Sequence, residues 1–410
     1  METSKSRSSA TNNNQEAMIQ KPIVIPLFML KFQLPSELFL PIVASNLHGV
    51  SIASVNSTRD ENKMMSKLSQ TCRYFYSLYQ PELEKRAAKK LLECFFIPTE
   101  TNVKKAMAML LANPKLAFVK IENDKTMTDM RQRGFEGSLL QAAMQTKAVG
   151  WLNWLKKEVI EKTHTQAEAH AQYQEKFGQP DERKARMLTQ LNIDLKAIEA
   201  ALTQDPCTNS IPTLQATLDA FEMMRKHFAE ENKAGQVIKT GEFFPLEIMQ
   251  KIYEVYCKHW DDDSWSGNQL SCYSKFIIGF APRFFTTDDL LRLLKGLGNN
   301  FDEEVPLFGD FKQTVQVNNR QYDLDFTNLE KYSDCQLGRD FFVDGYFGGL
   351  CGPSPFQRAC YSPYVRVSEG VVIGMTLVWK SCVEQKLQTC RTYATTANSE
   401  MERMHDCLKK

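Results

Sequence analysis

The residues of this chain best suited to covalent chemistry are its cysteines, and Cys351 has the most suggestive surroundings. It lies in a glycine-rich run, residues 348–353, where glycine and proline predict a tight turn that exposes the thiol. A nucleophilic thiol needs a histidine base and a carboxylate that orients the base. His259 or His405, together with one of the carboxylates in residues 261–263, would complete such a Cys-His-Asp set.

The spacing of these residues does not require catalysis, because a chain with 11 cysteines and 6 histidines always offers some such combination. A cysteine in an ordinary turn explains Cys351 more simply. We therefore predict that the protein is not an enzyme and has no catalytic residue. A Cys-dependent enzyme that uses Cys351 is kept as an alternative, and the activity of the C-terminal part stays open.

Metal and cofactor sites are not predicted either. The stretch His259-Trp260-Asp261-Asp262-Asp263 lacks the alternating carboxylates and the distal Glu of a calcium loop, so we expect a solvated acidic loop after a helix. The spacings among Cys382, Cys390, His405 and Cys407 match no common structural zinc site. The chain also has no phosphate-binding glycine loop and no zinc-protease helix motif.

The composition excludes several classes of partner. Lys and Arg number 50 and Asp and Glu 49, so a net charge of +1 gives no general attraction to nucleic acid. The longest apolar run, Ile23–Leu30, is short and contains Pro26, and it falls well below the roughly 20 residues of a membrane span. The odd number of cysteines without a Cys-x-x-Cys pair indicates reduced thiols, so we predict a cytoplasmic protein without a membrane span.

Changes in composition divide the 410 residues into four parts. Residues 1–21 are polar and predict a disordered tail. Residues 22–96 are apolar at helical spacing and predict a helical unit. Residues 97–235 predict a helical middle domain. Residues 236–410 are richer in aromatic residues, glycine and cysteine, and they predict an α+β domain, so the fold class is mainly α with a mixed C-terminal part.

Several helices can be predicted together with their ends. Thr101 is a good N-cap for a helix over residues 102–111. Apolar residues three and four apart predict buried faces on helices over 187–202 and 214–232. Pro81 is predicted to interrupt the helix in which it falls.

The C-terminal part gives weaker signals. Thr286 and the two aspartates after it predict the start of a leucine-rich helix. Alternating apolar residues on either side of Asn318-Asn319 predict a hairpin over 314–326. Residues 365–379 are rich in β-branched side chains and fit either a strand or a buried helix.

The N-terminal helical unit carries the most specific pattern of the sequence. Leu-Pro-Ser-Glu-Leu occupies residues 34–38, apolar Ile42 and Leu47 follow, and Leu-Ser-Gln-Thr-Cys-Arg occupies residues 68–73 before aromatic residues. A proline at the start of a helix costs no hydrogen bond, and the apolar side chains then recur at roughly helical spacing. Two short helices cannot bury such faces alone, so they require a third helix or a partner.

This pattern resembles an F-box, and the resemblance covers residues 32–80, under a fifth of the chain. Members of that family use a small helical unit to bind the Skp adaptor of cullin-RING ubiquitin ligases. Carried over by position, the resemblance implies an adaptor-facing surface made of Leu34, Pro35, Leu38, Ile42, Leu47 and Leu68.

The chain also departs from the F-box pattern. Pro41 lies inside the expected first helix, where a proline costs about 3 kcal/mol. The loop between the two halves is longer than usual, and Phe75 or Tyr79 stands where the family often has Trp. The alternative is an ordinary amphipathic helical hairpin that begins with the same five residues.

A second resemblance lies in the middle domain. Gly-Ser-Leu-Leu-Gln-Ala-Ala at residues 137–143, followed by Val149, Leu152 and Leu155, is similar to the start of an ankyrin repeat and its second helix. One or two degenerate units would not form a solenoid, since roughly three repeats are needed for stability. A plain helical bundle is the alternative.

Taken together, the polar start, the F-box-like unit and the ankyrin-like middle resemble F-box/ankyrin-type effectors that intracellular bacteria secrete into the host cytosol. The resemblance implies a non-catalytic virulence adaptor that docks the Skp subunit and recruits an unknown target protein, without nucleic acid as a partner. A helical protein-interaction scaffold with no ubiquitin link is the main alternative.

Overall fold

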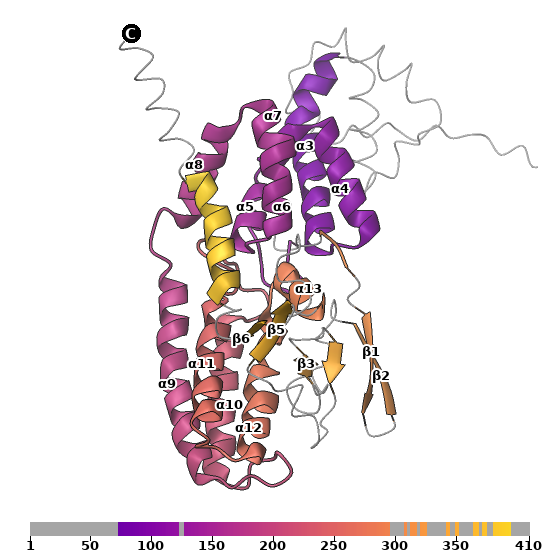
Figure 1. The fold of residues 1–410 in the computed structure, drawn as a ribbon. Helices are drawn as coiled ribbons and strands as arrows, with labels where there is room; N and C mark the ends of the chain where they lie inside the picture. Colours follow the sequence, from indigo (N-terminus) through magenta and orange to yellow (C-terminus); the bar gives the residue numbers. More distant parts are fainter. Residues whose placement is uncertain are drawn as a thin grey trace, which may run out of the picture. The chain divides into compact units, whose positions relative to one another are not determined.

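A computed structural model gives the fold of the chain (Figure 1). It describes residues 73–122, 127–295, 307–309 and 380–394, and six strands between residues 312 and 374. The described residues are mostly helical, which confirms the predicted mainly α class. None of the described helices combines the length and the apolar character needed to span a membrane.

Helices form nearly all of the described chain up to residue 295. Short 3-10 segments and two π-helical turns, Lys156–Ile160 and Ser274–Ile278, connect or extend them. In chain order the α-helices are α3 (Arg73–Phe96), α4 (Glu100–Ala112), α5 (Leu139–Gln145), α6 (Val149–Leu155), α7 (Glu161–Thr163), α8 (Gln166–Phe177), α9 (Glu182–Gln204), α10 (Gln215–Glu231), α11 (Glu247–Asp261), α12 (Gly267–Tyr273) and α13 (Thr287–Lys295).

The chain divides into two compact units, Met1–Leu83 and Glu84–Lys410, and the boundary falls within α3. This helix continues through Pro81, so the prediction that Pro81 interrupts it is wrong. A proline removes one backbone hydrogen bond and disfavours the turn before it, but packing can hold such a helix together. From Ala88 to Phe96 the apolar face of α3 is buried, and this face anchors its C-terminal half.

A first hydrophobic core lies between α3, α4, α5, α6 and α8. Leu92 from α3, Leu110 from α4 and Leu152 from α6 are all fully buried in it. Ile238 and Phe243, which come after the predicted domain boundary at residue 235, belong to the same core. Packing therefore crosses residue 235, where composition changes.

A second hydrophobic core lies between α9, α10, α11, α12 and α13. Helices α9 and α10 confirm the helices predicted over 187–202 and 214–232, and their buried faces have the expected spacing. In Figure 1 these two helices run side by side, with α11 next to them. Phe221 of α10 stacks on Phe276 with 5.4 Å between the ring centroids, which fixes α10 against the turn after α12.

The helix over residues 380–394, yellow in Figure 1, contributes to both cores. Cys382 and Val383 near its start lie in the second core, and Cys390 and Tyr393 near its end lie in the first. The Tyr393 hydroxyl donates a hydrogen bond of 2.5 Å to the Leu152 carbonyl oxygen of α6. This helix therefore packs against both groups of helices, although it follows them by more than 80 residues in the sequence.

Strands occur only as three separate antiparallel hairpins among the described residues. They are β1–β2 (Lys312–Val317 and Arg320–Asp325), β3–β4 (Phe342–Asp344 and Gly349–Cys351) and β5–β6 (Tyr364–Ser368 and Val371–Gly374). The strands of the first hairpin end and begin on either side of the predicted Asn318-Asn319. Strands β5 and β6 fall mostly within residues 365–379, for which the sequence fitted either a strand or a buried helix. The described residues after 235 are mainly helical, so the predicted α+β character of residues 236–410 has no support.

Candidate functional site

The predicted adaptor-facing residues cannot be placed in the fold. Leu34, Pro35, Leu38, Ile42, Leu47 and Leu68 lie outside the described residues, which begin at residue 73. The aromatic residues that follow the motif fall within α3. The docking surface therefore stays a prediction from sequence.

The alternative of a catalytic Cys351 required His259 or His405 as its base, and the described residues do not supply a free one of these two. Cys351 ends strand β4 and pairs with Phe342 of β3. His259 is buried at the end of α11, where its ring stacks on Trp265 at a centroid distance of 3.8 Å. Its Nε2 contacts a Glu199 carboxylate oxygen at 2.8 Å and its Nδ1 contacts the Ser264 hydroxyl at 2.5 Å. Both ring nitrogens are thus engaged, and His405 lies outside the described residues.

Three of the described cysteines have environments that disfavour the thiolate. Cys382, Cys390 and Cys272 are buried among apolar side chains. Burial raises the pKa of the Cys390 thiol to about 11 and also raises the pKa of the Cys382 thiol. A contact with Cys207, and then burial, raises the pKa of the Cys272 thiol. These thiols therefore serve as small apolar side chains.

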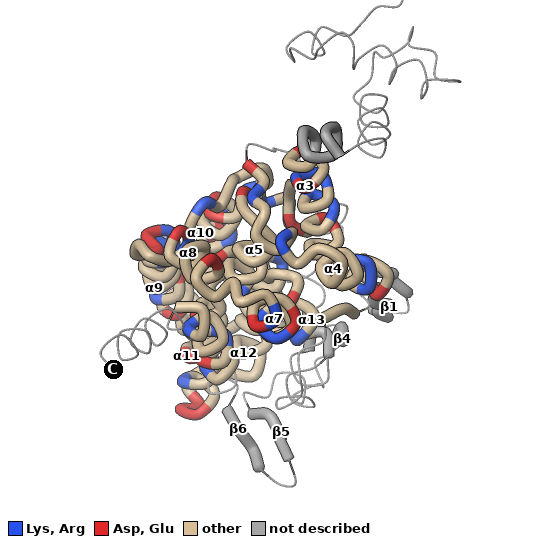
Figure 2. The backbone as a smooth tube through the Cα atoms, turned by 90° about the horizontal axis from the view of Figure 1, so that it is seen from above, with Lys and Arg blue, Asp and Glu red and all other residues tan. Residues whose placement is uncertain are grey.

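Within the described residues, no three metal-ligating side chains come together. Cys382 and Cys390 lie in different hydrophobic cores, and His405 and Cys407 are outside the described part of the chain. Residues 261–263 are exposed at the end of α11, as a solvated acidic loop would be. Figure 2 shows basic and acidic positions interspersed along the described helices.

Sequence reasoning missed a buried arginine that holds several segments together. Arg133 is fully buried, and its Nε donates to an Asp129 carboxylate oxygen at 2.7 Å. Its Nη1 donates to the carbonyl oxygens of Phe243 at 3.0 Å and of Phe284 at 3.1 Å. The guanidinium also lies over the Phe243 ring, 5.2 Å from its centroid. Arg133 thus links the first core to the segment before α13.

Two further buried carboxylates pair with lysines from distant segments. A Glu242 carboxylate oxygen lies 2.7 Å from Lys147 Nζ and 3.0 Å from Lys184 Nζ. Burial alone would raise the pKa of Glu242, but these two ammonium groups lower it overall. Lys386, from the helix over 380–394, contacts the buried carboxylate of Asp289 of α13. In each case the opposite charge comes from within the chain, so these groups hold the fold together.

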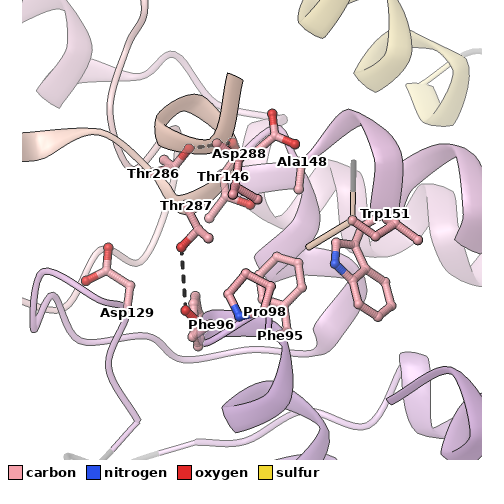
Figure 3. A pocket seen from close by; sticks show the side chains of 12 residues that line it. Phe95, Phe96, Pro98, Asp129, Thr146, Ala148, Trp151, Thr286, Thr287 and Asp288 are labelled. Atoms are coloured by element: carbon pink, nitrogen blue, oxygen red, sulfur yellow. Dashed lines mark hydrogen bonds between the residues drawn. The ribbon is translucent and has the colours of Figure 1, made fainter. Parts of the chain in front are cut away.

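A small pocket next to Arg133 is drawn in Figure 3. Phe95, Phe96 and Trp151 form an aromatic wall, and Asp129 and Asp288 are at its edge. The indole N–H of Trp151 is buried and has no hydrogen-bond partner. The space open to a water-sized sphere is only about 20 Å³, which is enough for one water and too small for an organic ligand.

A larger groove lies between α9 and the end of α10. It offers about 500 Å³, within the range of pockets that bind ligands or peptide side chains. It is lined by Ala185, Arg186, Met187, Thr189, Gln190, Leu191 and Asp194 of α9 and by His227, Phe228, Glu230 and Glu231 of α10. This groove is the candidate binding site of the described residues.

A histidine–aspartate pair forms one end of this groove. His227 Nδ1 lies 3.0 Å from both carboxylate oxygens of Asp194, which is 6% exposed, and Gln190 donates to the same carboxylate at 3.0 Å. This contact places the proton on Nδ1 and leaves Nε2 for another partner. Such a pair can accept a proton, but the groove lining contains no serine or cysteine that would act as a nucleophile.

No protein-family model, no curated protein and no solved structure matches the chain. The F-box-like and ankyrin-like interpretations therefore remain predictions. At the ankyrin-like position the structure has the short helices α5 and α6, and the Ser138 side chain caps α5 in a capping box with Gln141.

Some of these features left a signal in the sequence and others did not. The regular spacing of Leu191, Leu195, Ile198 and Leu202 predicts the buried face of α9, and a groove beside that face follows from packing against α10. Asp194 and His227 are 33 residues apart and carry no motif. Their contact becomes visible only once the two helices are paired.

Proposed function

We propose that the protein is a non-catalytic adaptor that docks the Skp subunit of a cullin-RING ubiquitin ligase and recruits a target protein. The observation that carries this proposal is the F-box-like pattern at residues 34–38 and 68–73. A protein that brings a target close to a ligase needs no catalytic residue of its own, because proximity raises the effective concentration of the target. The proposal includes secretion by a bacterium and action in a host cytosol.

Two findings in the described residues support an adaptor. The chain divides within α3 at residue 83, so residues 84–410 form a compact unit separate from the segment that carries the F-box-like pattern. In the second unit buried charged groups pair with partners from distant segments, and the thiols of Cys272, Cys382 and Cys390 have raised pKa values. These groups have structural roles, which favours binding over thiol chemistry.

A binding measurement with purified proteins tests the proposal. The full chain is compared with the double variant Leu34→Ala/Pro35→Ala for binding to a purified Skp adaptor. We expect binding to weaken at least tenfold, as for the loss of central apolar contacts in an interface. Leu111→Ala is the matched control, because Leu111 is 59% exposed on α4 of the second unit. Equal recovery of the Skp adaptor by all three proteins would reject the ubiquitin link and leave the helical scaffold.

A further inference from the structure

The groove between α9 and α10 has the length of a short helix. The two helices are antiparallel, since Arg183 contacts Glu231 at one end and Thr217 contacts Ala201 further along. The lining of α9 extends from residue 185 to residue 194, which at 1.5 Å per residue is roughly 15 Å, or about three helical turns. A third helix lying along two antiparallel helices is a common way to recognise a peptide.

The groove has an apolar floor, and exposed apolar side chains lie near its Asp194–His227 end. Met187, Leu191 and Phe228 lie at the bottom, where they belong to the second core. Ile193 is 57% exposed and Met223 is 49% exposed. Neither residue lines the groove itself. Ile193 follows Gln190 by three positions and Met223 precedes His227 by four, so helical spacing places both side chains about one turn beyond the groove lining, near its Asp194–His227 end.

Of the two glutamates at the groove margin, one forms ion pairs with arginines and the other does not. Glu231 contacts Arg183 at 3.7 Å and Arg186 at 3.6 Å. Glu230 is exposed on the same side of α10 and has no ion-pair partner among the described residues. The groove thus leaves one carboxylate without a cation, and this carboxylate lies seven residues, or two turns, after Met223.

We propose that this groove binds one amphipathic helix of the recruited protein. The helix places aliphatic side chains on Ile193 and Met223 and a Lys or Arg opposite Glu230. The inference rests on the proposed adaptor function and assigns target recruitment to α9 and α10. The groove length favours this occupant over a second copy of the chain, because a stable homodimer buries about 800 Å² on each partner, more than a three-turn groove provides.

Designed peptides provide the test. The first probe is a 14-residue helical peptide with Leu at positions i, i+3, i+4 and i+7 and Lys at the margins. The second has Glu in place of Lys, and the third is a scrambled version of the first. Binding of each labelled peptide to the full chain is measured by fluorescence anisotropy. We expect the basic peptide to bind and the other two to bind at least tenfold more weakly.

Variants at the groove are compared with matched variants outside it. Ile193→Ser/Met223→Ser and Glu230→Lys should each weaken binding of the basic peptide, the double variant about tenfold and the charge reversal several-fold. Leu218→Ser and Glu222→Lys make the same changes at exposed positions outside the groove and should leave binding unchanged. Thermal melting checks that every variant is folded.

Three outcomes would overturn the proposal. They are absence of binding by the basic peptide, equal binding by the scrambled peptide, and equal effects of the groove and control variants. Sedimentation velocity of the peptide-free chain addresses the other occupant, and a dimer that Ile193→Ser/Met223→Ser dissociates would assign the groove to a second copy. The Leu34→Ala/Pro35→Ala variant should still bind the basic peptide, so a failure of Skp docking and a failure of the groove can be told apart.

Discussion

Replacement of Arg133 by Met should destabilise the second unit strongly. The side chain is fully buried and its guanidinium contacts Asp129, two backbone carbonyl oxygens and the Phe243 ring. Met fills a similar volume but donates no hydrogen bond. The variant removes the guanidinium that pairs with the Asp129 carboxylate, which is 8% exposed, and breaking a buried ion pair in this way costs about 3–5 kcal/mol.

The local structure narrows this range. Asp129 keeps hydrogen bonds from the backbone N–H groups of Arg131 and Arg133, each at 2.9 Å. These bonds partly satisfy the carboxylate, so we expect a loss in the lower half of the range, about 3–4 kcal/mol. The double variant Arg133→Met/Asp129→Asn removes the unpaired charge and should recover more than about 1 kcal/mol relative to the sum of the single variants.

Urea unfolding followed by circular dichroism measures these free energies, with an unchanged m-value as the check that the unfolded state is the same. Lys104→Met is the control, because Lys104 forms an exposed ion pair with Glu100 on α4 and should change stability by less than about 0.5 kcal/mol. If Arg133→Met costs no more than Lys104→Met, Arg133 does not link the first core to the segment before α13.

Two further predictions concern a buried aspartate and the thiols. Asp205 accepts hydrogen bonds from the backbone N–H groups of Cys207 and Leu214 and from Thr213, and although burial would raise its pKa, these bonds lower the pKa overall. Asp205→Ala should cost about 2–3 kcal/mol at pH 7 in urea unfolding. Because the folded-state pKa is depressed, this stabilisation is present above the unfolded value near 4 and should shrink as the pH falls below it, so a gap between wild type and variant that stays constant down to pH 2 would contradict the assignment. With iodoacetamide at pH 7.5, Cys390 should react roughly a hundredfold or more slowly than an unperturbed thiol, because its pKa is raised to about 11, and mass spectrometry of labelled peptides measures the rate. Fast, selective labelling of Cys351 in the same experiment would instead favour the cysteine-dependent enzyme.

Helices whose apolar residues recur at regular spacing could be predicted from the sequence. The residues at which those helices begin and end were harder to predict. Apolar residues three and four apart locate α9 and α10 because burial of one face is the main force that holds such helices. The N-cap of α4 lies two residues before the predicted Thr101. Thr99 caps the helix, not Thr101, because its side chain accepts a hydrogen bond from the Asn102 N–H while Thr101 lies in the first turn. Both threonines fit the preference for such a cap, and only backbone geometry separates them.

The candidate site and the buried charges could not be predicted. A lysine or arginine in a sequence indicates an exposed side chain, and Arg133 and Lys386 carry no sign that they are buried. Their partners are decided by how the helices pack, as is the contact between Asp194 and His227. The compositional change near residue 235 also suggested a boundary, yet Phe243 packs in the first core with α3.

The buried charges explain why the two cores pack together in one specific arrangement. Apolar surfaces alone can slide over one another at a low energetic cost, whereas a buried charge without its partner costs several kcal/mol. Arg133, Glu242 and Lys386 each need a partner from a distant segment, so only one relative placement of those segments satisfies all three. Glu242 also pairs with Lys184 of α9, and Arg133 donates to Asn232 at the end of α10, so these charges help to hold the two helices in place. A groove between two fixed helices binds a partner without first being ordered. If this reasoning holds, Arg133→Met should weaken the basic peptide's binding at temperatures well below its own unfolding transition.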